Sequence, residues 1–252
     1  MRCIAFGSMI VSMLWSLTLQ AQQNRSLTCL SAAYPPYVID DDGLTGIDVD
    51  VVREAGRRLG LDIKIRLEPW KRLEEALSAG LRDCVFSYFK TDPRKAYAMY
   101  TSVPLHITQY TLFVRTDQTP QTRTLQDLFG KTIAVNRGFQ TTPEFESARR
   151  QGQIKVIEVG RDEQSMRMLA LGRVHAVLTN ADVGQHVIRK LGLDDIEPLM
   201  PPMSITPAYL VLRKAPEFEP LRDQFNWALF EILKDGTYER IRERYIDEAQ
   251  YD

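Results

Sequence analysis

Apolar and polar residues follow two different periodic patterns along this chain. Residues 26–34, 62–68 and 83–89 are short apolar or alternating runs, which predict strands. Between these strands, apolar residues recur at helical spacing in residues 43–61 and 70–80. Each of these two predicted helices ends at a glycine. Strands that alternate with helices of this length are typical of parallel βαβ units, so the pattern predicts an α/β fold.

The same alternation of predicted strands and helices begins again in the second half of the chain, from "TLQDLFG" onward. A second series of βαβ units predicts a second domain, and the segments "VRTDQTP" and "MPPMSITP" resemble crossings between the two. We predict lobe 1 from residues 27–114 plus 207–252 and lobe 2 from residues 115–206. The hinge is then expected in residues 114–117 and 204–208.

The first residues of the chain show neither the strand nor the helix periodicity. Residues 4–19 form an apolar run that is broken by glycine, serine and threonine, after Arg2 and before small and polar residues. A membrane-spanning helix needs about 20 apolar residues. The run is shorter than that, so it predicts a secretory signal peptide, residues 1–21, that is cleaved after Ala21.

Charge and cysteine content narrow the class of protein. The formal net charge is −1 without a basic tract, so we expect no nucleic-acid partner. Export implies an oxidising compartment, where only Cys29 and Cys84 would remain after cleavage. We expect two buried free thiols, because adjacent parallel strands seldom offer disulfide geometry; a disulfide is the alternative.

Catalytic and metal-binding patterns are missing from the sequence. His106, His175 and His186 are not at ligand spacing with cysteine or carboxylate partners, and neither "HExxH" nor "GxSxG" occurs. No glycine-rich phosphate loop is present. We therefore expect no cofactor, no metal and no catalytic residue.

Several polar and aromatic residues lie near the ends of predicted strands: Tyr34, Trp70, Ser87 and Arg94. Ligands of parallel sheets bind beyond the carboxyl ends of the strands, so this shared position indicates a site. Trp70 and Phe89 are candidates for the aromatic wall of a small-molecule cleft, and the alternative is ordinary core packing.

Arg94 has an unusual predicted position. Thr91 or Asp92 followed by Pro93 predicts the start of a helix, which puts Arg94 in its first turn. A cation is disfavoured there by roughly several tenths of a kcal/mol, because the helix dipole is positive at that end. Arg94 therefore either pairs with Asp92 or binds an anion from outside the chain.

Longer segments resemble a known family. They are, in order, "YPPYVIDDDGLTGIDVDVVREAGRRLGL", "LEEALSAGLRDCVFSYFKTDPRKAYAMYTSVP", "LQDLFGKTIAVNRG", "LALGRVHAVLTN" and "LFEILKDGTYERIRERY". The chain resembles family 3 extracellular solute-binding proteins, the polar amino-acid receptor type of ABC importers, in a divergent bacterial branch. This implies the two-lobed type II periplasmic-binding-protein fold, in which each lobe is a mostly parallel sheet flanked by helices and two crossing strands join the lobes. It also implies a monomeric, non-enzymatic periplasmic protein that closes on a small molecule and delivers it to an importer permease.

The resemblance assigns roles to four of the candidate residues. An arginine at the position of Arg94 binds the ligand carboxylate, which suits the bidentate geometry of a guanidinium. Ser87 matches a residue that contacts ligand. Tyr34 and Trp70 match residues of the pocket wall.

Two departures from the family pattern concern the ligand. Asn180 stands where amino-acid receptors carry the aspartate that binds the ligand ammonium, and an amide cannot neutralise that charge. In the loop after Gly138, two residues intervene before Thr141, which is the expected hydroxyl contact. These departures favour a small carboxylate-bearing polar solute over a standard α-amino acid, unless another acid such as Asp182 reaches the site.

Two other functions fit the same scaffold. Cyclohexadienyl dehydratases resemble this family, but their chemistry needs a general acid, and Asp92, Glu144 and Asp182 carry no signature of one. A ligand-sensing partner of a membrane receptor is the other alternative, which the residues do not distinguish from an importer component.

Overall fold

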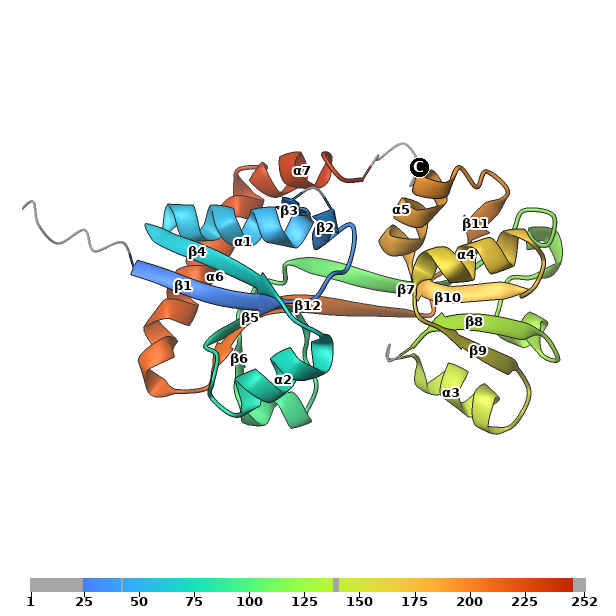
Figure 1. The fold of residues 1–252 in the computed structure, drawn as a ribbon, viewed down its shortest axis with the longest axis horizontal. Coiled ribbons are helices and arrows are strands. Elements are labelled where there is room, and N and C mark those ends of the chain that lie inside the picture. Colours follow the sequence, from blue (N-terminus) through green and yellow to red (C-terminus); the bar gives the residue numbers. More distant parts are fainter. Residues whose placement is uncertain (1–24, 42, 138–140, 247–252) are drawn as a thin grey trace, which may run out of the picture.

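Two lobes connected by two long strands make up the protein (Figure 1). The structure is a computed structural model that describes residues 25–246 apart from residues 42 and 138–140. The predicted signal peptide and Gly138 lie outside the described residues. The connecting strands are β7 (His106–Arg115) and β12 (Ser204–Arg213), which run side by side across the middle of the molecule.

The main sheet has ten strands along the path β4-β1-β5-β12-β7-β10-β8-β9, with β11 paired to β7 and β6 to β12. The other strands are β1 (Arg25–Ser31), β4 (Leu61–Leu67), β5 (Cys84–Phe89), β6 (Ala98–Tyr100), β8 (Thr132–Asn136), β9 (Lys155–Val159), β10 (Ala176–Asn180) and β11 (Ile196–Pro198), and β2 (Ile39–Asp41) pairs with β3 (Gly43–Thr45). Within each lobe the neighbouring strands β4-β1-β5 and β10-β8-β9 are parallel. The predicted α/β fold with two mostly parallel sheets is confirmed, and antiparallel β12 and β7 join these sheets into one.

Helices cover both faces of each sheet. Lobe 1 carries α1 (Ile47–Arg58), α2 (Trp70–Ser78), α6 (Glu219–Lys234) and α7 (Thr237–Arg242), and lobe 2 carries α3 (Pro143–Arg150), α4 (Asp162–Ala170) and α5 (Ala181–Leu191). In lobe 1, α1 and α6 pack on one face and α2 on the other (Figure 1). Within the part of the chain that the structure describes, none of these helices has the length and apolar character needed to cross a membrane.

The segment at Arg94 differs from the prediction. Pro93–Ala96 is a four-residue 3-10 turn rather than the start of an α-helix, and neither Thr91 nor Asp92 caps it with its side chain. A helix dipole needs aligned peptides over several turns, so this short turn does not repel the Arg94 guanidinium as predicted.

Strand pairing shows where the chain passes between the lobes. Residues 106–110 of β7 pair with residues 204–208 of β12, and from Tyr110 onward β7 pairs with β10. Tyr110, Leu112 and Val114 pack in the core of lobe 2. The lobe boundaries remain a proposal, and this pairing favours a first crossing at residues 106–110, earlier than residues 114–117.

Cys29 and Cys84 form a disulfide, so the prediction of free thiols is wrong. They are direct partners in the parallel pair of β1 and β5, with their Cα atoms 4.5 Å apart. Both side chains are fully buried. This register, which the sequence does not reveal, brings the two sulfurs within bonding distance.

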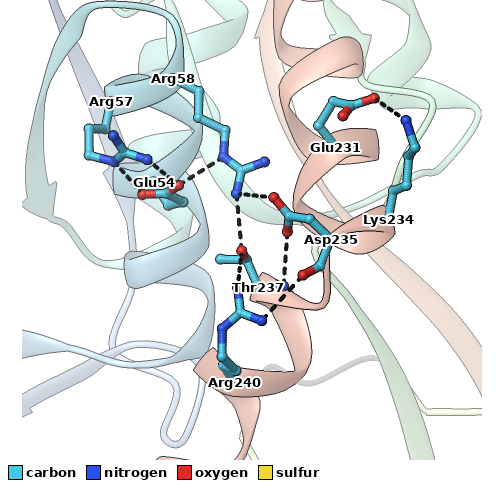
Figure 2. A network of polar contacts seen from close by, with 8 residues as sticks. All are labelled: Glu54, Arg57, Arg58, Glu231, Lys234, Asp235, Thr237 and Arg240. Carbon is cyan, nitrogen blue, oxygen red and sulfur yellow. Dashed lines mark hydrogen bonds and ion pairs between the residues drawn. The ribbon is translucent and has the colours of Figure 1, made fainter.

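A polar network fastens the C-terminal helices to α1 (Figure 2). Glu54 accepts hydrogen bonds from Arg57 (2.6 and 2.8 Å) and from Arg58 (2.8 Å). Arg58 also contacts Asp235 at 2.8 Å and donates to Thr237 at 3.0 Å. Arg58 therefore links α1 to the turn between α6 and α7.

This network predicts a stability change in acid. Hydrogen bonds from Arg57 are the largest cause that lowers the pKa of Glu54 from 4.5 to about 2. A carboxyl whose pKa is lower in the folded state stabilises the fold above its unfolded pKa and loses that contribution as the pH falls toward 2. The free energy of unfolding of the wild type should exceed that of Glu54→Gln by about 1 kcal/mol at neutral pH.

Urea denaturation of both proteins from pH 7 to pH 2 measures this difference, which should shrink below pH 4.5. Glu75→Gln is the matched control, since Glu75 is exposed on α2 and makes no ion pair with a described residue. A difference that stays constant down to pH 2 would contradict the assignment.

Candidate functional site

Arg94 is buried and already bound to a carboxylate of the chain. Its side chain is 8% exposed, and its Nε and Nη2 lie 3.0 and 3.4 Å from the two carboxylate oxygens of Glu74. Nη1 donates to the carbonyl of Phe89 at 3.2 Å. Asp92 pairs instead with Lys95 at 2.7 Å, so the predicted alternative of an Arg94–Asp92 pair is wrong.

Aromatic rings surround this ion pair. The Arg94 guanidinium carbon lies 4.2 Å from the ring centre of Tyr88 and 5.8 Å from that of Trp70. The Tyr97 hydroxyl donates to Glu74 at 3.0 Å. The hydrogen bond from Arg94 is the largest cause that lowers the pKa of Glu74. Trp70 is therefore placed beside Arg94, as predicted for a shared site, although it also packs in the lobe 1 core.

The ion pair leaves part of the guanidinium available. An arginine has five N–H donors, and Glu74 and the Phe89 carbonyl account for three of them. The other two make no hydrogen bond to a described residue. Phe89 itself packs against the core of lobe 2, so the Arg94 region borders the space between the lobes.

Ser87 lies in a buried network that the sequence did not reveal. Its hydroxyl donates to Asp48 at 2.6 Å, and His106 Nδ1 lies 2.8 Å from the same carboxylate oxygen. His106 Nε2 is 3.1 Å from the Thr108 hydroxyl. The φ angle of Ser87 is 58°, which is unusual for a residue other than glycine and often marks a functional position.

The turn with Tyr34 and Tyr37 reaches from lobe 1 to lobe 2. The Tyr37 hydroxyl donates a hydrogen bond to Asp182 of α5, and the centre of the Tyr37 ring lies 3.6 Å from that of the His106 ring, on which it stacks. The turn packs directly on Gly46, where a Cβ atom would lie 2.4 Å from the Tyr37 carbonyl oxygen. Burial is the largest cause that raises the pKa values of both tyrosine hydroxyls.

Asn180, in lobe 2, lies near the turn that carries Tyr34 and Tyr37. It ends β10 and caps α5, where its Oδ1 accepts from the backbone N–H of Asp182 at 2.8 Å. Its Nδ2 is buried and makes no hydrogen bond of normal geometry with a described residue. The amide nevertheless lies close enough to Tyr34 and Tyr37 to lower the pKa of each hydroxyl in part. The structure therefore brings the predicted residues Tyr34 and Asn180 together.

Asp162 is a residue of this region that the sequence analysis missed. It begins α4, and its two carboxylate oxygens accept from Thr179 Oγ1 at 2.8 Å and Asn136 Nδ2 at 2.9 Å. Burial is the largest cause that raises its pKa. Its position directly after the strand that ends at Val159 was the available signal, because it shares that position with Tyr34 and Arg94.

Thr141, another predicted site residue, forms a hydrogen bond within the chain. The Thr141 hydroxyl donates to Glu146 in α3. A pocket of about 230 Å³ between the lobes is lined by Tyr37, His106, Asp182, Arg242 and neighbouring residues, none of them among the predicted site residues. Throughout residues 25–246, excluding the gaps, no group of three or more His, Cys, Asp or Glu side chains is arranged to hold a metal ion.

Comparisons with known proteins concern the family and the fold of the chain. The family model of bacterial extracellular solute-binding proteins, family 3, matches residues 27–248. A probable amino-acid-binding protein, YxeM of Bacillus subtilis (strain 168), is 27% identical over 84% of this chain and 80% of its own length. The L-cystine-binding protein TcyJ of Escherichia coli (strain K12) is 24% identical over 87% of this chain and 82% of its own length. A crystal structure of a mutant ArgBP from T. maritima has a TM-score of 0.70 and 28% identity, and the match covers 90% of this chain and 97% of that one.

Proposed function

This chain belongs to family 3 of the bacterial extracellular solute-binding proteins, and from that premise we propose that it captures a small carboxylate-bearing polar solute, an amino acid or a related molecule. The solute binds between the lobes, in the periplasm, and is delivered to the permease of an ABC importer. The relatives reported above are named as binding proteins, which favours this function over a dehydratase-like enzyme.

The observation that carries the proposal is the partly satisfied guanidinium of Arg94. Glu74 occupies its Nε edge, so a ligand carboxylate would use the remaining N–H donors of the terminal nitrogens. The backbone around Phe89 fixes the orientation of Arg94, and the aromatic rings exclude water from one side of it. A charge-assisted hydrogen bond in such surroundings is stronger than in water.

Closure of the lobes would complete the site. Ligand groups that contact Arg94 in lobe 1 and Asn180 in lobe 2 stabilise the closed form, because only that form presents both contacts. The hydrogen bond from Tyr37 to Asp182 already links the two lobes, which supports a form in which they lie close together. The two crossing strands allow the rotation without breaking either parallel sheet.

A screen of small molecules tests the function. The mature chain, melted with each of the twenty standard amino acids, L-cystine and simple dicarboxylates such as succinate, should show a higher melting temperature with at least one carboxylate-bearing compound. X-ray scattering with that compound should show a smaller radius of gyration than without it. Stabilisation by neutral sugars alone, or an unchanged radius at saturation, would contradict the proposal.

A further inference from the structure

We propose that Asp162 supplies the negative charge that binds the amino group of the ligand, in place of an aspartate at the position of Asn180. This inference rests on the proposed function and names its ligand class, a zwitterion with both an ammonium and a carboxylate. It reverses the expectation, drawn from Asn180 alone, that a primary ammonium binds weakly.

The position of Asp162 suits a ligand contact. It is the first residue of α4 and lies against Asn136 at the end of β8 and Thr179 near the end of β10. Carboxyl ends of parallel strands form the binding edge of such a sheet. The residue as a whole is only partly buried.

The bonding of Asp162 leaves room for a cation. Each of its oxygens accepts one side-chain hydrogen bond from a neutral group, whereas a carboxylate oxygen can accept two hydrogen bonds. Among the described residues, no lysine, arginine or histidine forms an ion pair with it. A partly buried carboxylate without a counter-ion is destabilised, and a ligand ammonium would remove that penalty.

Asp162 and Asn180 both lie near Tyr34. Both lie close enough to Tyr34 to influence the pKa of its hydroxyl, and Asp162 also acts on Tyr110 of β7. The Nδ2 of Asn180 is a buried donor without a hydrogen bond of normal geometry in the described chain. Beside Tyr34 the lobe 2 face thus offers an acceptor for an ammonium and a donor for a ligand oxygen.

Asp182, the other acid near Asn180, is engaged elsewhere. Its carboxylate accepts the hydrogen bond of Tyr37, and it lines the separate pocket with Arg242.

The charges of the site also favour a zwitterion. Glu74 already neutralises Arg94, so a ligand with a carboxylate and no ammonium would add a second negative charge beside that of Asp162 in the proposed site.

The test compares ligands with and without the amino group. Calorimetry uses whichever of the twenty standard amino acids or L-cystine gives the largest thermal shift, together with its N-acetyl derivative. The wild type should bind the free amino acid about 30-fold or more tightly than the derivative. Asp162→Asn should lose at least that factor for the free amino acid and should bind the derivative at least as tightly as the wild type does, because the variant removes a like charge.

Two further variants separate charge from structure. Glu163→Gln is the control: Glu163 is next in the sequence and, among the described residues, pairs only with exposed Lys190 at 3.5 Å, so this variant should bind like the wild type. The double variant Asp162→Asn, Asn180→Asp should regain affinity for the free amino acid, because it restores one negative charge to the lobe 2 face.

The outcomes also distinguish this inference from the proposed function. Equal affinity of the wild type for the two ligands, binding of dicarboxylates but no amino acid, or an Asp162→Asn variant that binds like the wild type overturns the role of Asp162. Each of these results leaves carboxylate binding at Arg94 intact. The affinity of Arg94→Ala for the same ligand tests that carboxylate binding separately.

Discussion

Replacing Arg94 with alanine should weaken binding of the best carboxylate probe by about 30-fold or more. The variant removes the guanidinium that would hold the ligand carboxylate and leaves Glu74, a second negative charge, in its place. Calorimetry on the wild type and the variant measures the loss. Wild-type affinity in Arg94→Ala would show that the site lies elsewhere.

The same variant should also be less stable. Arg94 bridges α2 and the end of β5 through Glu74 and Phe89, and its side chain packs on Tyr88. Breaking a buried ion pair costs about 3–5 kcal/mol, but Glu74 is 37% exposed and water compensates it in part, so we expect about 1–3 kcal/mol. Lys95→Ala is the matched control, since Lys95 is exposed and pairs only with exposed Asp92.

Removing the disulfide should have the largest effect on stability. Cys29 and Cys84 are 55 residues apart in the sequence, and the chain-entropy model gives about 4 kcal/mol for a loop of that length. Replacing both cysteines with alanine should lower the free energy of unfolding by roughly this amount. Guanidinium chloride denaturation with and without a reductant measures it, and the double variant should not respond to the reductant.

Thiol counting gives an independent check on the disulfide. The denatured, unreduced mature protein should contain no free thiol, and the reduced protein should contain two. Two free thiols before reduction, or equal stability of wild type and double variant, would contradict the pairing of β1 with β5 at this register.

Local patterns were sufficient for the fold. The helices α1 and α2 and the strands around them lie where apolar periodicity and closing glycines placed them. These signals depend on residues three or four apart, which the chain brings together as soon as it forms a helix. The restart of the pattern after residue 115 likewise indicated two sheets, although only the structure shows that β12 and β7 join them.

The candidate site could be found from the sequence only as a set of positions. Residues after strand ends were recognisable, and the structure does place Trp70 beside Arg94 and Tyr34 beside Asn180. Their partners were not recognisable. Ser87 bonds to Asp48 and Asp48 to His106, across 39 and 58 positions of sequence, and no local rule relates residues so far apart.

By itself, then, the sequence determined most of the secondary structure, the two-lobed α/β class and the family, because each rests on local periodicity or on motifs in linear order. The tertiary structure alone decided which charged and sulfur-bearing side chains meet. The register of β1 against β5 joins Cys29 to Cys84, and the packing of α2 against β5 gives Arg94 its partner Glu74. Such contacts depend on how elements distant in sequence are placed in space, and a shift of one residue in the register of β1 against β5 would already separate Cys29 from Cys84.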